Sequence, residues 1–491
     1  MNSFKNILIA FAVICVASFT SCSSEDDLNT VPVTSFSDLS VFENLSRVDQ
    51  QVNGLYATAK NGNVLGGRFF VYNEVRAENF INETNNNVTA FSVWNHTTQA
   101  TNGNDVTNLW NISYLGINRI NVFLVGIDAN TQKLKDLGVS DETMNGFRGE
   151  ARFLRGLLYK NLLMLYARPF ADGAGARPGL PLQLSGNVAS GENRLARSTV
   201  AQVYTQILED LNFAEANLPA IRATPFLSTT RAIKSAAIAM KVRVFLHMQR
   251  YPDVVTEANK LVSIAAPFRS STAIPHALAA TVTVAFSTPY TNVERIFNMP
   301  FNENDLPGTQ NGLGSYFNPN PRGIGDFSMN RLGLVADTVN WRNGDDRRAF
   351  IFLNASNNKI YWNKFPTGPQ HLDFVPVIRY AEVLLSLAES LARTGNTTRS
   401  LEILNAVRTR ARGIAFAAFP SQNDLIEAIL KEREIEFLGE GFRSPDLLRL
   451  LRPLPAKGGI TAIPATSTGY IWPIPQGELL INKAMEQNPG Y

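Results

Sequence analysis

Apolar residues recur most regularly along the segment "GFRGEARFLRGLLYKNLLMLYARPF", residues 146–170. Steps of three and four residues place such positions on one face of a helix. The stripe consists of Phe147, Ala151, Leu154, Leu158, Leu162 and Leu165. The helix should end at Arg168-Pro169, because the residue before a proline avoids the helical conformation.

The same kind of pattern predicts three other helices. Two are expected over about 39–58 and 106–125, where apolar positions again repeat at helical spacing. The third follows a loop rich in glycine and proline, 172–197, and begins with Ser198 or Thr199 as its N-cap.

Two later segments each read as a helix, a tight turn and a second helix. They span 236–262 and 380–411, and small residues stand where two helices would approach closely, at Ala237, Ala258, Ala381 and Ala388. Each segment resembles a tetratricopeptide (TPR) unit, a helix pair that buries its apolar face by stacking on neighbours. We therefore expect TPR-like helix pairs at about 231–264 and 378–412, embedded in a larger fold because the spacing is not a strict repeat.

The intervening residues 265–376 show no sustained helical period. They contain the turn-rich stretch "NENDLPGTQNGLGSYFNPNPRG" and two short strand-like runs, "AFIFL" and "KIYWNKF". A loop-rich region of this length inside a helical scaffold usually carries function. It is the part of the chain where we expect ligand binding.

The N-terminus has the form of a secretory signal. Lys5 precedes the apolar stretch 7–19, which is too short for a permanent membrane span. "FTSC" then ends at Cys22 and resembles the lipobox of bacterial lipoproteins, although Phe19 replaces the usual aliphatic residue. The following "SSEDD" resembles the surface-export signal of Bacteroidetes lipoproteins. These features predict a signal peptide over 1–21, a lipidated Cys22, a flexible tether over 22–35 and a surface-exposed, lipid-anchored place in the outer membrane.

Composition excludes several classes of function. The 491 residues include two cysteines and four histidines, and the formal net charge is +3. If Cys15 leaves with the signal peptide and Cys22 carries lipid, no thiol remains for a disulfide, a metal or a nucleophile. The histidines stand alone in the sequence, so neither a metal nor another cofactor is expected. No cluster of basic residues suggests nucleic-acid binding.

The end of the chain carries a family resemblance. "VIRYAEVLLSLAESLARTGN", "LNAVRTRA", "LIEAILKEREIEFLGEGFRSPDLLRL" and "WPIPQGELLINKAMEQNPGY" together resemble the C-terminal signature of the SusD/RagB family of nutrient-binding outer-membrane lipoproteins. "GEARFLRGLLYKNLLMLYARPF" is similar to the N-terminal signature of that family, and "DDRR" with "NKF" to its middle segment. One departure is "FRSPDLLR", where the family commonly has an aromatic residue in place of Ser444 or Pro445.

The resemblance implies a mainly α fold, in which four TPR-like helix pairs form a scaffold beside a large loop-rich ligand-binding part. It divides the chain into an N-terminal region, 36–220, and a C-terminal region, 221–491. It also implies a protein that is not an enzyme but captures oligosaccharides at the cell surface and delivers them to a SusC-type TonB-dependent transporter. The alternatives are a peptide-binding lipoprotein of a nutrient importer and a TPR-like adaptor that binds other envelope proteins.

One cluster of carboxylates allows an enzymatic reading. "EREIEF", 432–437, lies close in sequence to Glu440 and Asp446, and a glycosidase needs two opposed acids. We favour a structural network, because nearby arginines would lower the carboxylate pKa values while a general acid needs a raised one. The arginines are Arg433, Arg443 and Arg449. Within the same segment Glu427 and Lys431 have the spacing of a helical ion pair.

The asparagine-rich segment 76–110 is the first candidate for ligand binding. Sugar rings stack on indoles, and their hydroxyl groups match the donor and acceptor of an amide. The candidates are Glu78, Asn79, Trp94 and Asn95. Trp94 serves either as a ligand platform or as a loop anchor, whereas Trp110 falls on a helical stripe and should be core.

Further candidates lie in the loop-rich middle of the chain. Tyr316 stands among glycine and asparagine and could occupy a loop tip, and Trp341 is followed by the polar Arg342. Trp362 alternates with Ile360 in a strand-like run, a pattern that more often buries one of the aromatic residues. We therefore select Tyr316, Trp341 and Arg342 as ligand-binding candidates.

Overall fold

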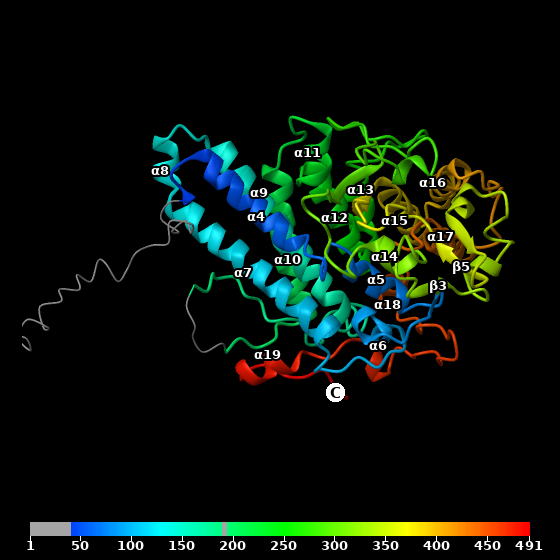
Figure 1. Ribbon diagram of the computed structural model, residues 1–491. Helices are drawn as coiled ribbons and strands as arrows, with labels where there is room; N and C mark the ends of the chain where they lie inside the picture. The colour runs from blue at the N-terminus through cyan, green and yellow to red at the C-terminus, as the bar shows by residue number, and fades with distance from the viewer. Residues whose placement is uncertain (1–40, 189–193) are drawn as a thin grey trace, which may run out of the picture.

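The computed structural model describes residues 41–188 and 194–491, and this part of the chain is mainly α-helical (Figure 1). Cys22 and the predicted tether lie outside the described residues. No helix within those two ranges is long and apolar enough to cross a membrane. The helices are α4 (Leu45–Ala59), α5 (Arg68–Val75), α6 (Phe91–Trp94), α7 (Asn108–Ala129), α8 (Thr131–Asp136), α9 (Asp141–Tyr166), α10 (Val200–Asn217), α11 (Pro225–Thr230), α12 (Lys234–His247), α13 (Tyr251–Ala258), α14 (Leu313–Phe317), α15 (Tyr380–Arg393), α16 (Thr397–Arg410), α17 (Gln422–Glu436), α18 (Arg443–Arg449) and α19 (Gln476–Ile481).

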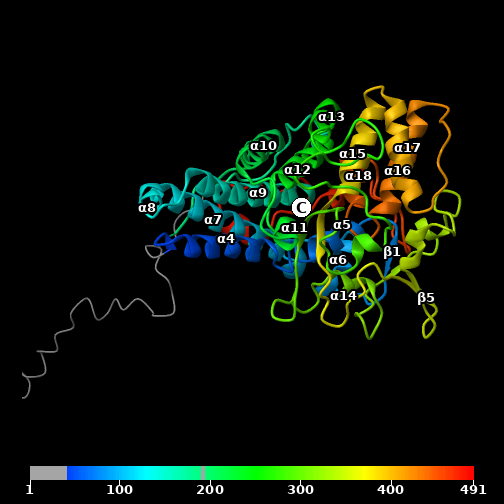
Figure 2. The same ribbon diagram turned by 90° about the horizontal axis from the view of Figure 1, so that it is seen from above.

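The long helices pack one against the next and form a scaffold. Helix α7 contacts both α4 and α9, and the contacts then continue from α9 to α10, α12, α13, α15 and α16 (Figure 2). The segments predicted as TPR-like pairs contain α12 with α13 and α15 with α16, and the helices of each pair contact each other. Most of the loop-rich part lies to one side of this row of helices.

Small residues allow this close packing. Ala237, Ala258, Ala381 and Ala388 are all completely buried, as their positions in the helix pairs predicted. Gly116 of α7 has the same role, because a Cβ atom at this position would lie 2.9 Å from Leu158 Cδ1 of α9. A larger side chain there would push the two helices apart.

Helix ends agree with the sequence to within a turn or two. Helix α9 begins earlier than the apolar stripe, because the Ser140 side chain accepts a hydrogen bond from the Thr143 N–H. It ends at Tyr166, just before Arg168-Pro169. Helix α10 begins with a capping box made by Thr199 and Gln202, so Thr199 is the cap.

Within residues 41–188 and 194–491, six short strands form three separate antiparallel pairs. Strand β1 (Phe80–Asn82) pairs with β3 (Phe327–Met329), β2 (Arg295–Met299) with β6 (Val375–Arg379), and β4 (Ile351–Asn354) with β5 (Lys359–Trp362). The β4–β5 hairpin confirms the two strand-like runs "AFIFL" and "KIYWNKF". The β1–β3 pair joins the asparagine-rich segment to the loop-rich middle of the chain.

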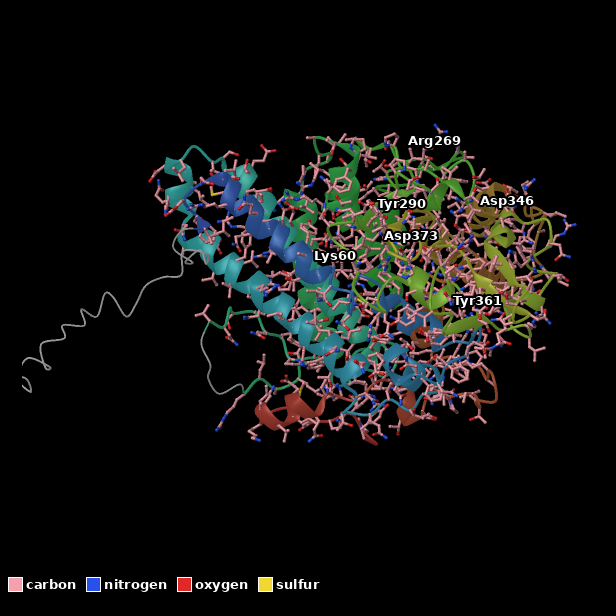
Figure 3. The ribbon with its side chains drawn as sticks, in the orientation of Figure 1. Lys60, Arg269, Tyr290, Asp346, Tyr361 and Asp373 are labelled. Atoms are coloured by element: carbon pink, nitrogen blue, oxygen red, sulfur yellow. The ribbon has the colours of Figure 1, made fainter. Side chains whose placement is uncertain are left out.

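Side-chain contacts help to fix the loops of the middle region. The Tyr290 hydroxyl donates a hydrogen bond to Asp373 at 3.0 Å, and both side chains are marked in Figure 3. Lys60 likewise forms an ion pair with Asp305 and donates to the Pro300 carbonyl oxygen at 3.0 Å. The loops are therefore held in place by polar contacts between segments that are far apart in the sequence.

Candidate functional site

An open hollow of ≈ 520 Å³ lies where three distant stretches of the chain meet. One stretch contributes Glu78, at the start of the asparagine-rich segment, and the second is the loop that follows β3. The third is a C-terminal hairpin over 454–463. We call this site the Glu78 hollow; its lining residues are Glu78, Asn330, Leu332, Gly333, Pro455, Ala456, Lys457, Gly458, Gly459, Ile460 and Thr461.

The first wall is held by Asn79, one of the predicted site residues. Its side-chain oxygen accepts a hydrogen bond from the Leu334 N–H at 3.1 Å, and its amide nitrogen donates to Glu434 at 3.0 Å. The Asn330 side chain in turn donates to the Glu78 carbonyl oxygen at 2.8 Å. These bonds fix the loop after β3 and leave Leu332 projecting, with 92% of its surface exposed.

The second wall is a tight hairpin. Lys457 and Ile460 exchange both backbone hydrogen bonds, at 3.0 and 2.6 Å. Gly458 and Gly459 form the turn with φ values of +47° and +82°, in the left-handed region that favours glycine. The wall therefore presents mainly backbone and small side chains to the hollow.

Trp94 lies beneath this turn. Its indole N–H donates to the Phe80 carbonyl oxygen at 2.9 Å, and the residue is only 6% exposed. A Cβ atom at Gly458 would lie 2.9 Å from the Trp94 ring, so the turn rests directly on the indole. Trp94 is therefore a loop anchor, and the alternative prediction of an exposed ligand platform is wrong.

The Glu78 carboxylate is paired with Arg443. The Arg443 Nε donates to Glu78 Oε1 at 3.0 Å, whereas the buried Glu78 Oε2 has no hydrogen-bond partner. Burial lowers the pKa of Arg443, but the carboxylates of Glu78 and Glu434 outweigh this effect and hold that pKa above its usual value. Arg443 therefore keeps its charge at neutral pH and forms an ion pair with Glu78.

Two other predicted aromatic platforms are buried elsewhere. Tyr316 lies on α14, is 1% exposed and donates its hydroxyl hydrogen to the Gln310 carbonyl oxygen. Trp341 is completely buried beneath the Arg348 guanidinium, 4.4 Å from the ring centre. The prediction of exposed rings is wrong at both positions, because neighbouring segments cover them. Trp110 and Trp362 are buried, as expected.

The polar candidates beside these rings have no shared site. Arg342 is exposed, and Asn95 is half-buried with its side-chain oxygen accepting hydrogen bonds from Thr97. Neither residue lines the Glu78 hollow. Of the residues selected from the sequence, Glu78 thus lines the hollow, Asn79 holds one wall from behind and Trp94 supports the turn of the other wall.

The carboxylate cluster near the C-terminus is a buried ionic network. Arg379 donates to both oxygens of Glu440, at 2.7 Å each, and Arg433 donates to Asp446 at 2.8 Å. Burial raises the pKa of Glu440, but the cations of Arg379 and Lys364 prevail and lower it. Ordinary general acids need the opposite shift, so the predicted structural network is confirmed.

One ion pair within that segment was predicted wrongly. Glu427 pairs with Arg452 rather than with Lys431, and Lys431 lies 2.7 Å from Glu434. Lys431 thus pairs with a residue three positions later on the same helix, whereas Glu427 pairs with a residue beyond the end of that helix. In addition, the two described ranges contain no group of three or more metal-ligating side chains.

A second polar hollow, of ≈ 600 Å³, lies between α9 and the end of α10. Its charges are already satisfied within the protein, because Glu150 accepts from Arg231 at 2.7 Å and lies 3.0 Å from Arg222. Arg231 also reaches Asp49 at 2.6 Å. These four charged residues form an internal ion cluster.

Known proteins share this architecture. The family model described as "SusD family" matches residues 351–491, and the one described as "Starch-binding associating with outer membrane" matches residues 26–246. The chain belongs to the SusD-like family. The departure at Ser444 and Pro445 therefore leaves the family assignment unchanged.

Individual SusD-like proteins agree with this chain over most of its length. A SusD superfamily structure from Bacteroides fragilis is 29% identical, covers 91% of this chain and 100% of its own, and has a TM-score of 0.80. A laminarin-binding SusD-like protein is 21% identical over 91% of this chain and 100% of its own, with a TM-score of 0.71. SusD-like protein P38 of Formosa agariphila is 21% identical over an alignment 541 residues long, gaps included, which covers 100% of both chains.

Sequence reasoning missed the C-terminal wall of the Glu78 hollow. The segment "PAKGGIT", 455–461, contains no aromatic residue and no motif of ligand chemistry. Its paired glycines indicated a tight turn, but only tertiary contacts bring that turn to Glu78. Leu332 was missed for the same reason.

Proposed function

We propose that this SusD-like protein captures oligosaccharides in the Glu78 hollow and releases them chemically unchanged. The proposal rests on the hollow itself, which is open and has walls held by hydrogen bonds. It combines apolar groups such as Leu332 and Ile460 with backbone and carboxylate acceptors. A sugar offers this same mixture of C–H faces and hydroxyl groups. Support also comes from the starch-binding description of the matching family model and from the laminarin-binding relative.

We further propose that the captured oligosaccharide passes to a SusC-type TonB-dependent transporter. The predicted lipid on Cys22 would hold the protein at the outer membrane, at the place where such a transporter takes up its substrate. The family description "associating with outer membrane" supports this location. The transporter, the anchor and surface exposure follow from the resemblance of the sequence to SusD/RagB lipoproteins.

A filled hollow provides the direct test. Ala456 is exposed on the wall, so Ala456→Trp should occupy the hollow without disturbing the core. Calorimetry and gel retardation with a panel of polysaccharides should detect binding by the unmodified protein and a loss of at least about tenfold in the variant. Ala418→Trp, exposed between α16 and α17, is the matched control. Equal binding by all three proteins would refute the proposed location of the site.

A groove on the helical side favours a second candidate function, binding of an envelope protein. The groove has a volume of ≈ 490 Å³ between α4 and α7, and its lining includes Leu55 and Val122. At its edge Val125 is 60% exposed, and exposed apolar patches commonly bind proteins. Val125→Asp should abolish co-purification of such a partner and leave glycan binding unchanged. If none of the glycans in the panel binds and an envelope protein co-purifies, this second function is favoured.

A further inference from the structure

Two cations are buried side by side behind the C-terminal wall of the Glu78 hollow. Arg76 is 1% exposed and Lys457 is 4% exposed. The Lys457 ammonium donates to the carbonyl oxygen of Val75, the residue that precedes Arg76. The two positive groups therefore belong to one small region of the protein, and Lys457 itself lines the hollow.

Neither cation has a carboxylate partner among the described residues. Arg76 donates one hydrogen bond to the Tyr470 carbonyl oxygen at 2.6 Å, while its Nη1 is buried without any partner. Other buried arginines differ, as Arg155 binds both oxygens of Asp210 at 2.6 and 2.8 Å. Burying a charge without a counter-charge is costly, so this region favours an anion.

Without a counter-charge, the surroundings disfavour the protonated forms of the basic groups in this region. Burial, and then the charge of Arg76, lower the pKa of Lys457 well below its usual value. Burial lowers the pKa of Arg76 to about 10, so that Arg76 still carries its charge at neutral pH. The nearby His96 has a buried Nε2 without a partner, and burial followed by Lys457 and Arg76 lower its pKa to about 2. Glu78 is the acid closest to this group, and it is engaged by Arg443.

We propose that the ligand of the Glu78 hollow is an acidic oligosaccharide, whose carboxylate or sulfate ester pairs with Lys457 in the positive field of Arg76 behind it. This inference rests on the proposed function, which places a glycan in the hollow. The anion would supply the counter-charge that this region lacks. A neutral sugar could occupy the same space but would leave both cations uncompensated.

The test compares three oligosaccharides of equal length by calorimetry: one with uronic acids, one with sulfate esters and one that is neutral. The unmodified protein should bind one of the acidic ligands about tenfold or more tightly than the neutral ligand. Lys457→Met removes the amine that lies over Trp94 and keeps an apolar side chain there; it should bind the acidic and neutral ligands with similar affinity. Arg331→Gln, an exposed cation on the loop after β3, is the control and should keep the preference.

The outcomes separate the two proposals. Equal affinity for acidic and neutral ligands, or an unchanged preference in Lys457→Met, overturns the acidic ligand class while glycan binding stands. Binding that Ala456→Trp leaves intact refutes the hollow as the glycan site. Lys457→Met should also melt no earlier than the unmodified protein, because it removes an uncompensated buried charge.

Proton uptake gives an independent readout. An anion next to Lys457 raises the lowered pKa of that amine, so binding should take up a proton and weaken as the pH rises. The groups that face Lys457 are Arg76, Glu78 and His96. Calorimetry in two buffers with different ionisation enthalpies should show uptake for the unmodified protein and none for Lys457→Met. Identical proton uptake by both proteins would contradict the role of Lys457.

Discussion

The side-chain oxygen of Asn79 accepts a hydrogen bond from the Leu334 N–H at 3.1 Å, across more than half of the chain. The same side chain donates to Glu434, on helix α17. Asn79 is 2% exposed and therefore positions the wall of the Glu78 hollow from behind. It acts as a positioning residue, which distinguishes it from groups on the surface of the hollow.

Removing this side chain should affect stability and binding together. Asn79→Ala leaves the Leu334 N–H without its side-chain acceptor and removes one donor from Glu434, and we expect the free energy of unfolding to fall by about 1–3 kcal/mol. Glycan affinity should fall as well, because the loop that carries Leu332 is no longer fixed. Urea unfolding and calorimetry measure the two effects. Asn95→Ala, whose side chain bonds only within its own turn, is the control and should change both by less.

Trp341 and Arg342 are neighbours with opposite expected effects. Trp341→Ala opens a cavity in the core and should reduce the free energy of unfolding by about 3–5 kcal/mol. Arg342→Ala changes an exposed residue and should alter it by less than about 0.5 kcal/mol. Thermal or urea unfolding checks both. If Trp341→Ala were as stable as the unmodified protein but no longer bound glycan, Trp341 would be a ligand platform, as the sequence suggested, and not a core residue.

The buried network around Glu440 should be far more sensitive than a surface pair. Glu440→Gln removes the charge that compensates Arg379 and Lys364, and we expect a loss of about 3–5 kcal/mol at pH 7. Glu427→Gln, in an exposed pair with Arg452, should cost about 1 kcal/mol or less. Because the pKa of Glu440 is lowered, its contribution is present above the carboxyl pKa of the unfolded chain and disappears as the pH falls through the lower folded value. Urea unfolding between pH 7 and 3 should show that the stabilities of the unmodified protein and of Glu440→Gln converge as the pH falls.

Glu74 should behave in the opposite way. It accepts a hydrogen bond from the Gly441 N–H, and burial raises its pKa to about 7 although the Gly439 and Gly441 N–H groups and Lys364 lower it. The folded state therefore favours the protonated form, and stability is lost as the pH rises from about 4.5 through 7. Glu74→Gln removes this titration and should be more stable than the unmodified protein at pH 8, by on the order of 2 kcal/mol. Equal pH profiles for the two proteins would contradict the raised pKa.

Cys22 provides the test of the proposed anchor. Cys22→Ala cannot accept the lipid, and the protein should move from the membrane fraction to the soluble fraction. Mass spectrometry of the unmodified protein should find a lipidated N-terminus at Cys22. Glycan affinity in solution should be the same for both, because residue 22 precedes the described body. An unmodified protein without lipid would refute the anchor and leave the binding site unaffected.

The scaffold was largely predictable because its signals are local. Apolar spacing predicted α9, the small residues indicated the helix pairs, and Thr199, one of two candidate caps, indicated the start of α10. The strands β4 and β5 were also visible as alternating runs. The exact ends depended on caps such as Ser140, which no apolar pattern reveals.

The site was only partly predictable because its chemistry is tertiary. Glu78 and Asn79 were found through a segment rich in polar residues, whereas the opposite wall at Gly458 carries no chemical signature. Trp94, Tyr316 and Trp341 are not the exposed ligand platforms that their polar sequence context suggested, since an aromatic residue in a polar stretch can be covered by a loop from elsewhere in the chain. Burial of an isolated aromatic residue depends on contacts that a single sequence does not contain.

The Glu78 hollow takes its lining from the beginning, the middle and the end of the described chain. A single occupant would touch all three, and it could be held only after the complete polypeptide had folded. Saturating occupant should therefore delay heat denaturation of the entire molecule and protect it from proteases. Occupancy of the hollow would therefore report on the folding of all three segments at once.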